Sequence, residues 1–141
     1  MRLILIKKFL IIFFLLISSE KLFSQANNSV IITVGNSPIT SLDLSKEIKI
    51  ISLLTNIKIQ ESNKNEIKNL AIQSLVKRAI KKSEIKRLKI TQYSAGDLER
   101  QMFTIAKGLG LDKENLKLYL KKNNIKYEDI EKNFEIDLKW N

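Results

Sequence analysis

The sequence has no cysteine and no histidine among its 141 residues. Disulfide bonds are therefore excluded, and the fold must be held together by packing alone. Zinc sites built from Cys or His are excluded too, as are Ser-His and Cys-His nucleophile pairs. General acid–base chemistry near neutral pH would depend on perturbed Asp, Glu, Lys or Tyr side chains. These absences predict a protein that is not an enzyme and that uses no metal or other cofactor.

Proline and glycine are scarce, with one Pro and four Gly. The single proline lies in Gly35-Asn36-Ser37-Pro38, a run of residues that favour a turn. Elsewhere no internal repeat, low-complexity tract or long linker divides the chain. The length of the sequence, with or without its first 26 residues, suits one domain.

The first 26 residues have the features of a secretory signal peptide. Arg2, Lys7 and Lys8 form a basic start, an apolar run follows at residues 9–17, and Ser24-Gln25-Ala26 offers small residues for cleavage. We therefore divide the chain into a signal peptide, 1–26, and one domain, 27–141. The protein is expected to be exported.

Two other interpretations of this segment stay open. An uncleaved membrane anchor needs about 20 apolar residues, and the run from Leu3 to Ile17 is shorter and is interrupted by Lys7-Lys8. A buried core element is the third possibility. With a cleaved signal, no stable membrane span is expected in the rest of the chain.

The chain is basic, with a formal net charge of +10. Residues 1–26 carry four basic residues and one Glu, so residues 27–141 keep a charge of +7. The lysines are scattered through Ile- and Asn-rich sequence, which favours solvated helix faces. Attraction to anionic lipid, acidic clients or nucleic acid is the alternative. Export argues against nucleic acid, so we expect none as a partner.

The stretch Val30-Ile31-Ile32-Thr33-Val34 is β-branched throughout and predicts a short strand. No partner strand is evident in the sequence. Because an unpaired apolar edge is a template for another chain, we expect this strand to pair with a second copy, a partner chain or a client strand.

Helical spacing of apolar residues and capping residues predicts five helices after the strand. Thr40 or Ser41 caps the first, Ser94 or Asp97 the third, and Asp112 the fourth. The predicted fold class is therefore mostly α: about five helices in an irregular bundle preceded by one short β-strand. The expected ranges are about 41–55, 65–88, 94–108, 112–122 and 127–140.

Several segments, in this order, are similar to one known family. The opening segment, Ile31 to Thr40, combines a strand, an Asn/Gly turn and Pro-Ile-Thr before the first helix. Later segments follow the same family pattern: Asp43-Leu44, 69–76, 88–91, 116–120 and 125–130. Together they resemble the N-terminal domain of the SurA family of periplasmic chaperones, which often also carry parvulin-type prolyl isomerase domains. The resemblance covers residues 30–140.

The resemblance implies a location in the periplasm of a Gram-negative bacterium and a non-catalytic function. The domain would bind unfolded outer-membrane or secreted proteins and assist their folding. The sequence includes no isomerase domain, so no isomerase site is expected. It also departs from the family at Glu131 or Lys132, where an Arg is common. Asn123-Asn124 stands where the family has Gly, although Asn tolerates the left-handed conformation.

A chaperone of this kind needs an exposed apolar groove for extended polypeptides. Met and aromatic residues suit such a surface because they adapt, or offer large area at low entropic cost. The alternative is that these residues form the helical core, which we prefer for Met102, Phe134 and Leu138. The candidate client-binding residues are Tyr93, Met102, Phe103, Tyr119, Tyr127, Phe134 and Trp140.

Two other functions stay open from the sequence. One is a truncated remnant of a parvulin-type isomerase and chaperone, with little activity of its own. The other is a basic helical module that binds anionic lipid or nucleic acid.

Overall fold

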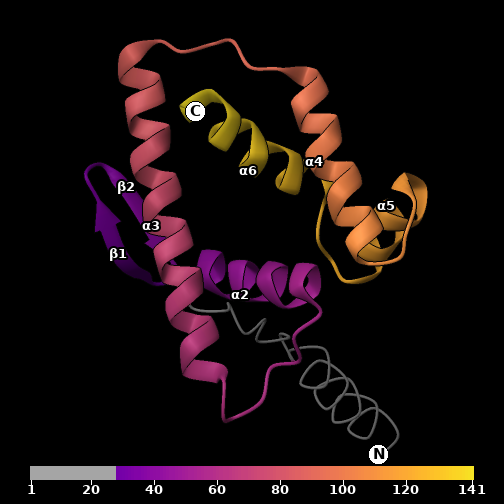
Figure 1. Ribbon diagram of the computed structural model, residues 1–141. Coiled ribbons are helices and arrows are strands. Elements are labelled where there is room, and N and C mark those ends of the chain that lie inside the picture. The colour runs from indigo at the N-terminus through magenta and orange to yellow at the C-terminus, as the bar shows by residue number, and fades with distance from the viewer. Residues whose placement is uncertain (1–27) are drawn as a thin grey trace, which may run out of the picture.

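The computed structural model describes residues 28–141, so the predicted signal peptide lies outside the described residues. The predicted mostly α fold is confirmed, with a small two-stranded sheet before five helices (Figure 1). None of the helices within residues 28–141 is long and apolar enough to cross a membrane. In chain order the elements are β1 (Val30–Val34), β2 (Ser37–Thr40), α2 (Ser41–Thr55), α3 (Lys64–Leu88), α4 (Ala95–Gly108), α5 (Lys113–Lys122) and α6 (Tyr127–Trp140).

The predicted strand has a partner within the chain, so the prediction that it stands unpaired is wrong. β1 and β2 form an antiparallel hairpin that begins with the pair Val34 and Ser37. In the two-residue turn, Gly35 adopts a φ of 57°, a left-handed conformation that costs glycine little. Pro38 favoured a turn in the sequence, so the second strand was not predicted. Both strands of a two-stranded sheet are edge strands, however, and proline is tolerated in an edge strand. The argument for pairing with a second chain depended on an unpaired strand and no longer holds.

The hairpin leads directly into α2 through a capping box. Thr40 Oγ1 accepts a hydrogen bond from the Asp43 backbone N–H at 3.2 Å, and Asp43 Oδ2 accepts one from the Thr40 backbone N–H at 2.8 Å. Two of the unpaired donors at the helix start are thereby satisfied. The predicted cap at Thr40 is confirmed.

Other predicted helix ends are confirmed as well. The side chains of Ser94 and Asp112 accept hydrogen bonds from the backbone at the starts of α4 and α5. Asn124, between α5 and α6, has a φ of 55°, the left-handed conformation that asparagine was expected to tolerate. These local signals set the lengths of the helices and of the turns between them.

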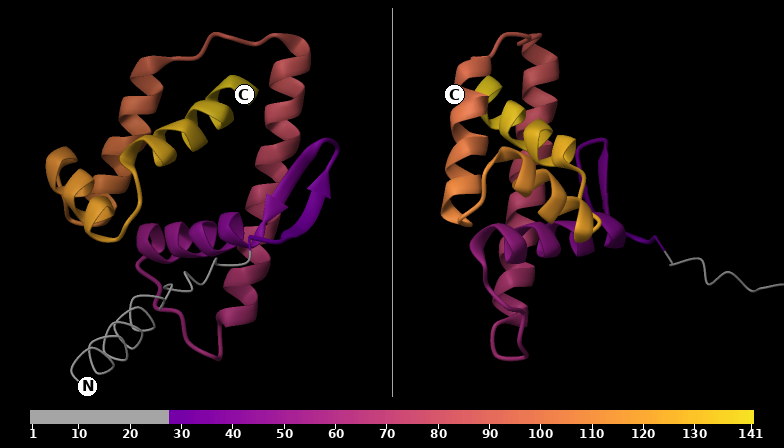
Figure 2. Two further views of the ribbon diagram at one scale, coloured as in Figure 1. Left: turned by 180° about the vertical axis from the view of Figure 1, so that it is seen from behind. Right: turned by 90° about the vertical axis from the view of Figure 1, so that its right-hand side faces the viewer.

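The last helix crosses the middle of the molecule. In Figure 1 the ribbons of α2, α3 and α4 surround α6, and the two views of Figure 2 agree with this arrangement. α6 packs against both α3 and α4, α2 crosses α3 and contacts it, and α5 contacts α4 and α6. Ile67 and Ala71 of α3 and Ile39 of β2 are buried, and one further apolar cluster is shared by α2, α4, α5 and α6. Its buried members are Ile50, Met102, Ala106, Leu116, Leu120, Ile125, Tyr127 and Ile130.

Candidate functional site

The seven residues predicted to bind clients divide between the surface and the core. Phe103 exposes 67% of its surface, Trp140 43% and Tyr93 39%. Met102 and Tyr127 are buried members of the core, which confirms the preferred interpretation of Met102. The other two are half-buried and pack against the same core: Tyr119 and Phe134.

Three of these residues meet in one hollow, which we call the α4 hollow. It has a volume of about 400 Å³ and lies between α4, the start of α5 and the first half of α6. Apolar side chains from α4 and α6 supply much of its wall. The lining consists of Gly96, Leu98, Glu99, Arg100, Met102, Phe103, Lys113, Tyr127 and Glu131.

The helical repeat of α4 explains how the hollow is built. Leu98 and Met102 are four residues apart and lie on the face that packs against the core. Phe103 is the next residue after Met102, so it lies about 100° further around the helix and faces solvent. The hollow therefore joins a buried floor, which includes Met102 and Tyr127, to an exposed aromatic ring at its edge.

Charged side chains of both signs surround this apolar floor. Arg100 forms an ion pair with Asp97, one turn earlier on α4. The side chains of Glu99, Lys113 and Glu131 form no ion pair or hydrogen bond with any residue from 28 to 141. The hollow therefore holds two unpaired carboxylates and one unpaired ammonium group.

The pKa of the Tyr127 phenol is shifted by charged side chains around the hollow. Burial raises the pKa of its phenol, and the carboxylate of Glu131 raises that pKa further. The ammonium group of Lys117, 5.6 Å from the ring centroid, acts in the opposite direction, while Glu114 and Glu99 act with Glu131. Carboxylates thus outnumber cations among the charges that act on this hydroxyl.

A second hollow, of about 440 Å³, lies between α4 and the second half of α6. Phe134 lines this second hollow together with Leu138 and Ile105. Phe134 is thus a fourth predicted client-binding residue that lines a hollow beside α4, but it does not line the α4 hollow. Gln101 also lines this second hollow, and its buried Oε1 has no hydrogen-bond partner within the described residues.

The remaining candidates lie apart from the α4 hollow. Tyr93 belongs to the segment between α3 and α4, and its ring centroid is 5.3 Å from the ammonium nitrogen of Lys139 on α6. Trp140 ends α6. Tyr119 packs against the core, and its backbone oxygen accepts a hydrogen bond from Asn123. None of these three lines the α4 hollow.

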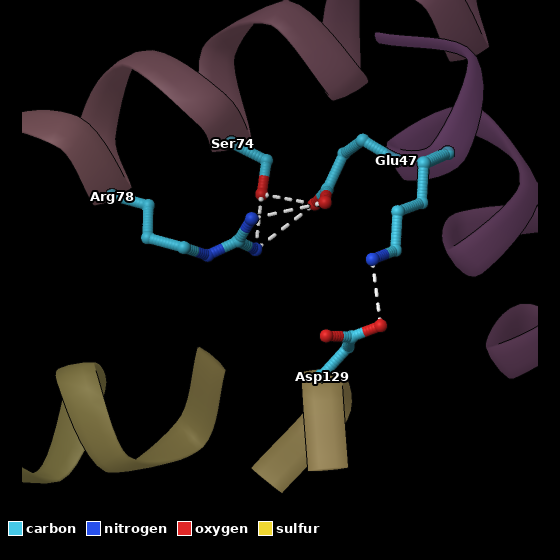
Figure 3. Close-up of polar contacts among 5 residues, drawn as sticks. Glu47, Ser74, Arg78 and Asp129 are labelled. Atoms are coloured by element: carbon cyan, nitrogen blue, oxygen red, sulfur yellow. Dashed lines mark hydrogen bonds and ion pairs between the residues drawn. The ribbon is translucent and has the colours of Figure 1, made fainter. Parts of the chain in front are cut away.

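Sequence reasoning missed a charged cavity of about 560 Å³ between α2, α3 and α6. At one wall Glu47 is only 4% exposed. Both terminal nitrogens of Arg78 donate to its carboxylate, at 2.9 and 3.0 Å, and Ser74 Oγ donates at 2.7 Å (Figure 3). A signal was present in the sequence, because Glu47 precedes the core residue Ile50 by one helical turn.

Other ion pairs around the charged cavity join α6 to its neighbours. Lys46 on α2 contacts Asp129 at 2.6 Å, and Lys81 on α3 contacts Asp137 at 2.6 Å (Figure 3 for Asp129). The carboxylates of Glu47, Asp129 and Asp137 have cationic partners from the protein itself. These ion pairs link α6 to α2 and α3, and the pair of Glu47 with Arg78 links α2 to α3.

The described residues contain no cluster of three or more side chains suited to holding a metal ion. Comparisons with known proteins found no matching family model, no similar curated protein and no similar solved structure. The similarity to SurA-type chaperones thus stays a prediction from the sequence segments quoted above.

Proposed function

We propose that this protein is an exported, non-catalytic chaperone-like protein that binds unfolded or extended polypeptides in the periplasm. The observation that supports this function best is the α4 hollow, where exposed Phe103 stands beside a floor of Leu98, Met102 and Tyr127. An apolar floor with a polar rim suits binding of other polypeptides. The sequence resemblance to SurA-type chaperones and the signal-like residues 1–26 support the same function.

The size of this surface suits weak and reversible binding. Covering one Phe side chain contributes about 1.5–3 kcal/mol, which corresponds to about a tenfold to hundredfold change in affinity. A chaperone must release its client, so a small contact of this strength is useful. The charged rim keeps the hollow hydrated when no client is bound.

The test is suppression of aggregation of an unfolded β-barrel protein by the purified protein and by a Phe103→Ser variant. We expect the variant to bind the client about tenfold more weakly or worse. Leu118→Ser is the matched control, because Leu118 is 63% exposed on α5 and does not line the α4 hollow. Folding of both variants is checked by circular dichroism.

Three results would contradict the proposal. The first is a wild-type protein that neither suppresses aggregation nor binds denatured protein. The second is an equal effect of the two substitutions. The third is binding that falls steeply with salt and is indifferent to client hydrophobicity, which would favour the basic lipid-binding or nucleic-acid-binding module. Prolyl isomerisation is expected at background rate, and measurable turnover would contradict a non-catalytic function.

A further inference from the structure

The α4 hollow has a charge that differs from that of the rest of the chain. The protein has 25 basic and 15 acidic residues and a formal net charge of +10, so the chain as a whole repels cations. Within the hollow the unpaired charges are Glu99, Glu131 and Lys113, and the Arg100 guanidinium is already paired with Asp97. The unpaired carboxylates therefore outnumber the unpaired cations here.

Carboxylates from three helices act on the tyrosine ring that lines the hollow. Glu131 follows Tyr127 by one helical turn, and both residues line the hollow. Glu131, Glu114 and Glu99 all raise the pKa of the Tyr127 phenol, and of these Glu114 is already paired with Lys117. Glu131 and Glu99 are left available to an incoming cation.

The rest of the lining suits the stem of a long basic side chain. Lys and Arg carry several methylene groups before their charge, and these groups pack on apolar surface while the charge stays in water. Leu98 and Met102 offer such a surface, and the exposed ring of Phe103 offers an aromatic face to a cation. A volume of about 400 Å³ leaves room for one extended side chain of this kind.

We infer that the α4 hollow takes a basic side chain, Arg or Lys, from an extended polypeptide whose neighbouring residues are apolar. The methylene stem lies on Leu98 and Met102, and the charge lies between Phe103 and the carboxylates of Glu131 and Glu99. This inference rests on the proposed function and specifies which segments of a client are held. It also gives a positively charged protein a local means of binding positively charged segments.

The test compares three fluorescently labelled peptides by anisotropy, each with the same apolar residues around a central Arg, Gln or Glu. The purified protein should bind the Arg peptide about threefold to tenfold more tightly than the Gln peptide, and the Glu peptide most weakly. Glu131→Gln should remove most of this preference, and adding Glu99→Gln should remove the rest. Lys113→Gln should increase it, because it removes the unpaired cation.

Glu128→Gln is the matched control, because Glu128 is also on α6 and is exposed, yet it does not line the hollow. It changes the net charge by the same amount as Glu131→Gln and should leave the Arg preference unchanged. Equal effects of the two substitutions, or equal affinity of the wild-type protein for all three peptides, would overturn the inference. If the inference failed in this way but Phe103→Ser still lowered the affinity for all three peptides, the proposed function would stand. Failure of the wild-type protein to bind any peptide would instead remove the proposed function itself.

Discussion

Glu47 is a buried carboxylate in a core that is otherwise mostly apolar. Burying such a charge is costly unless partners replace the lost water, and here Arg78 and Ser74 supply three hydrogen bonds. The Arg78 guanidinium donates two hydrogen bonds to the Glu47 carboxylate in a bidentate pair. This geometry neutralises the charge of Glu47 and also fixes the position of α2 on α3. This pair therefore contributes to the alignment of the helices.

Arg78→Ala should lower the free energy of unfolding by about 3–5 kcal/mol, because Glu47 is left as an uncompensated buried charge. Urea unfolding followed by circular dichroism measures this loss. Arg87→Ala is the control on the same helix, since the Arg87 side chain is 65% exposed and pairs with Glu84 within one turn. That substitution should cost less than about 1 kcal/mol.

A double substitution, Glu47→Met with Arg78→Met, separates charge from packing. Replacement of a buried ion pair by apolar side chains of similar volume is often neutral or stabilising. We expect the double variant to be more stable than Arg78→Ala. If Arg78→Ala and Arg87→Ala cost the same, the buried charge would not control stability at this site.

The hairpin is the element whose shape depends most on a single residue. Gly35 has a φ of +57°, and an added Cβ at this position would meet nothing within 4 Å. Gly35→Ala should therefore be destabilising through its backbone conformation alone, by about 1–2 kcal/mol. Gly108→Ala is the matched control, because it also has open space around it but lies in α4 without a positive φ.

Thermal unfolding of the two glycine variants checks this prediction. Gly108→Ala should leave stability unchanged or raise it by up to about 1 kcal/mol, since alanine favours the helix. An equal, small effect at both positions would mean that the turn tolerates a side chain. The hairpin would then be less strictly defined than its register indicates.

Helices were largely predictable from the sequence, whereas the hairpin and the site were not. Ser94 and Asp112 cap helices through contacts within three residues, so local sequence sets these ends. β2 was missed because its pairing with β1 outweighs the local preference of Pro38 for a turn. Pairing between segments, unlike capping, depends on the whole fold.

The candidate site shows the same limit. Met102 and Phe103 are adjacent and both apolar, yet one is 4% exposed and the other 67%. The difference arises because α6 packs on one face of α4 and leaves the next face to solvent. Sequence can place both residues on a helix, but the position of α6 decides which of them can contact a client. The buried ion pair of Glu47 was not predicted for a similar reason, because its partner Arg78 lies 31 residues away in the sequence.

Over the whole molecule, stability depends on apolar packing that no disulfide reinforces, and one cluster of this packing joins α2, α4, α5 and α6. Leu116 and Leu120 of α5 are almost fully buried in it, together with residues from α2, α4 and α6. Because α5 is short, its packing into this cluster holds it in place more than its own helix propensity does. Loss of one of these contacts should weaken all the helices that share the cluster.

Leu120→Ala should lower the free energy of unfolding by about 2–5 kcal/mol, through lost apolar burial and the cavity left behind. Leu118→Ala on the same helix should change it by less than about 0.5 kcal/mol, because Leu118 is 63% exposed. Urea unfolding should be followed by both circular dichroism and the fluorescence of the single tryptophan, Trp140. If the cluster acts as one unit, both signals shift together in Leu120→Ala. A shift confined to one signal would mean that α6 and the rest of the bundle unfold separately.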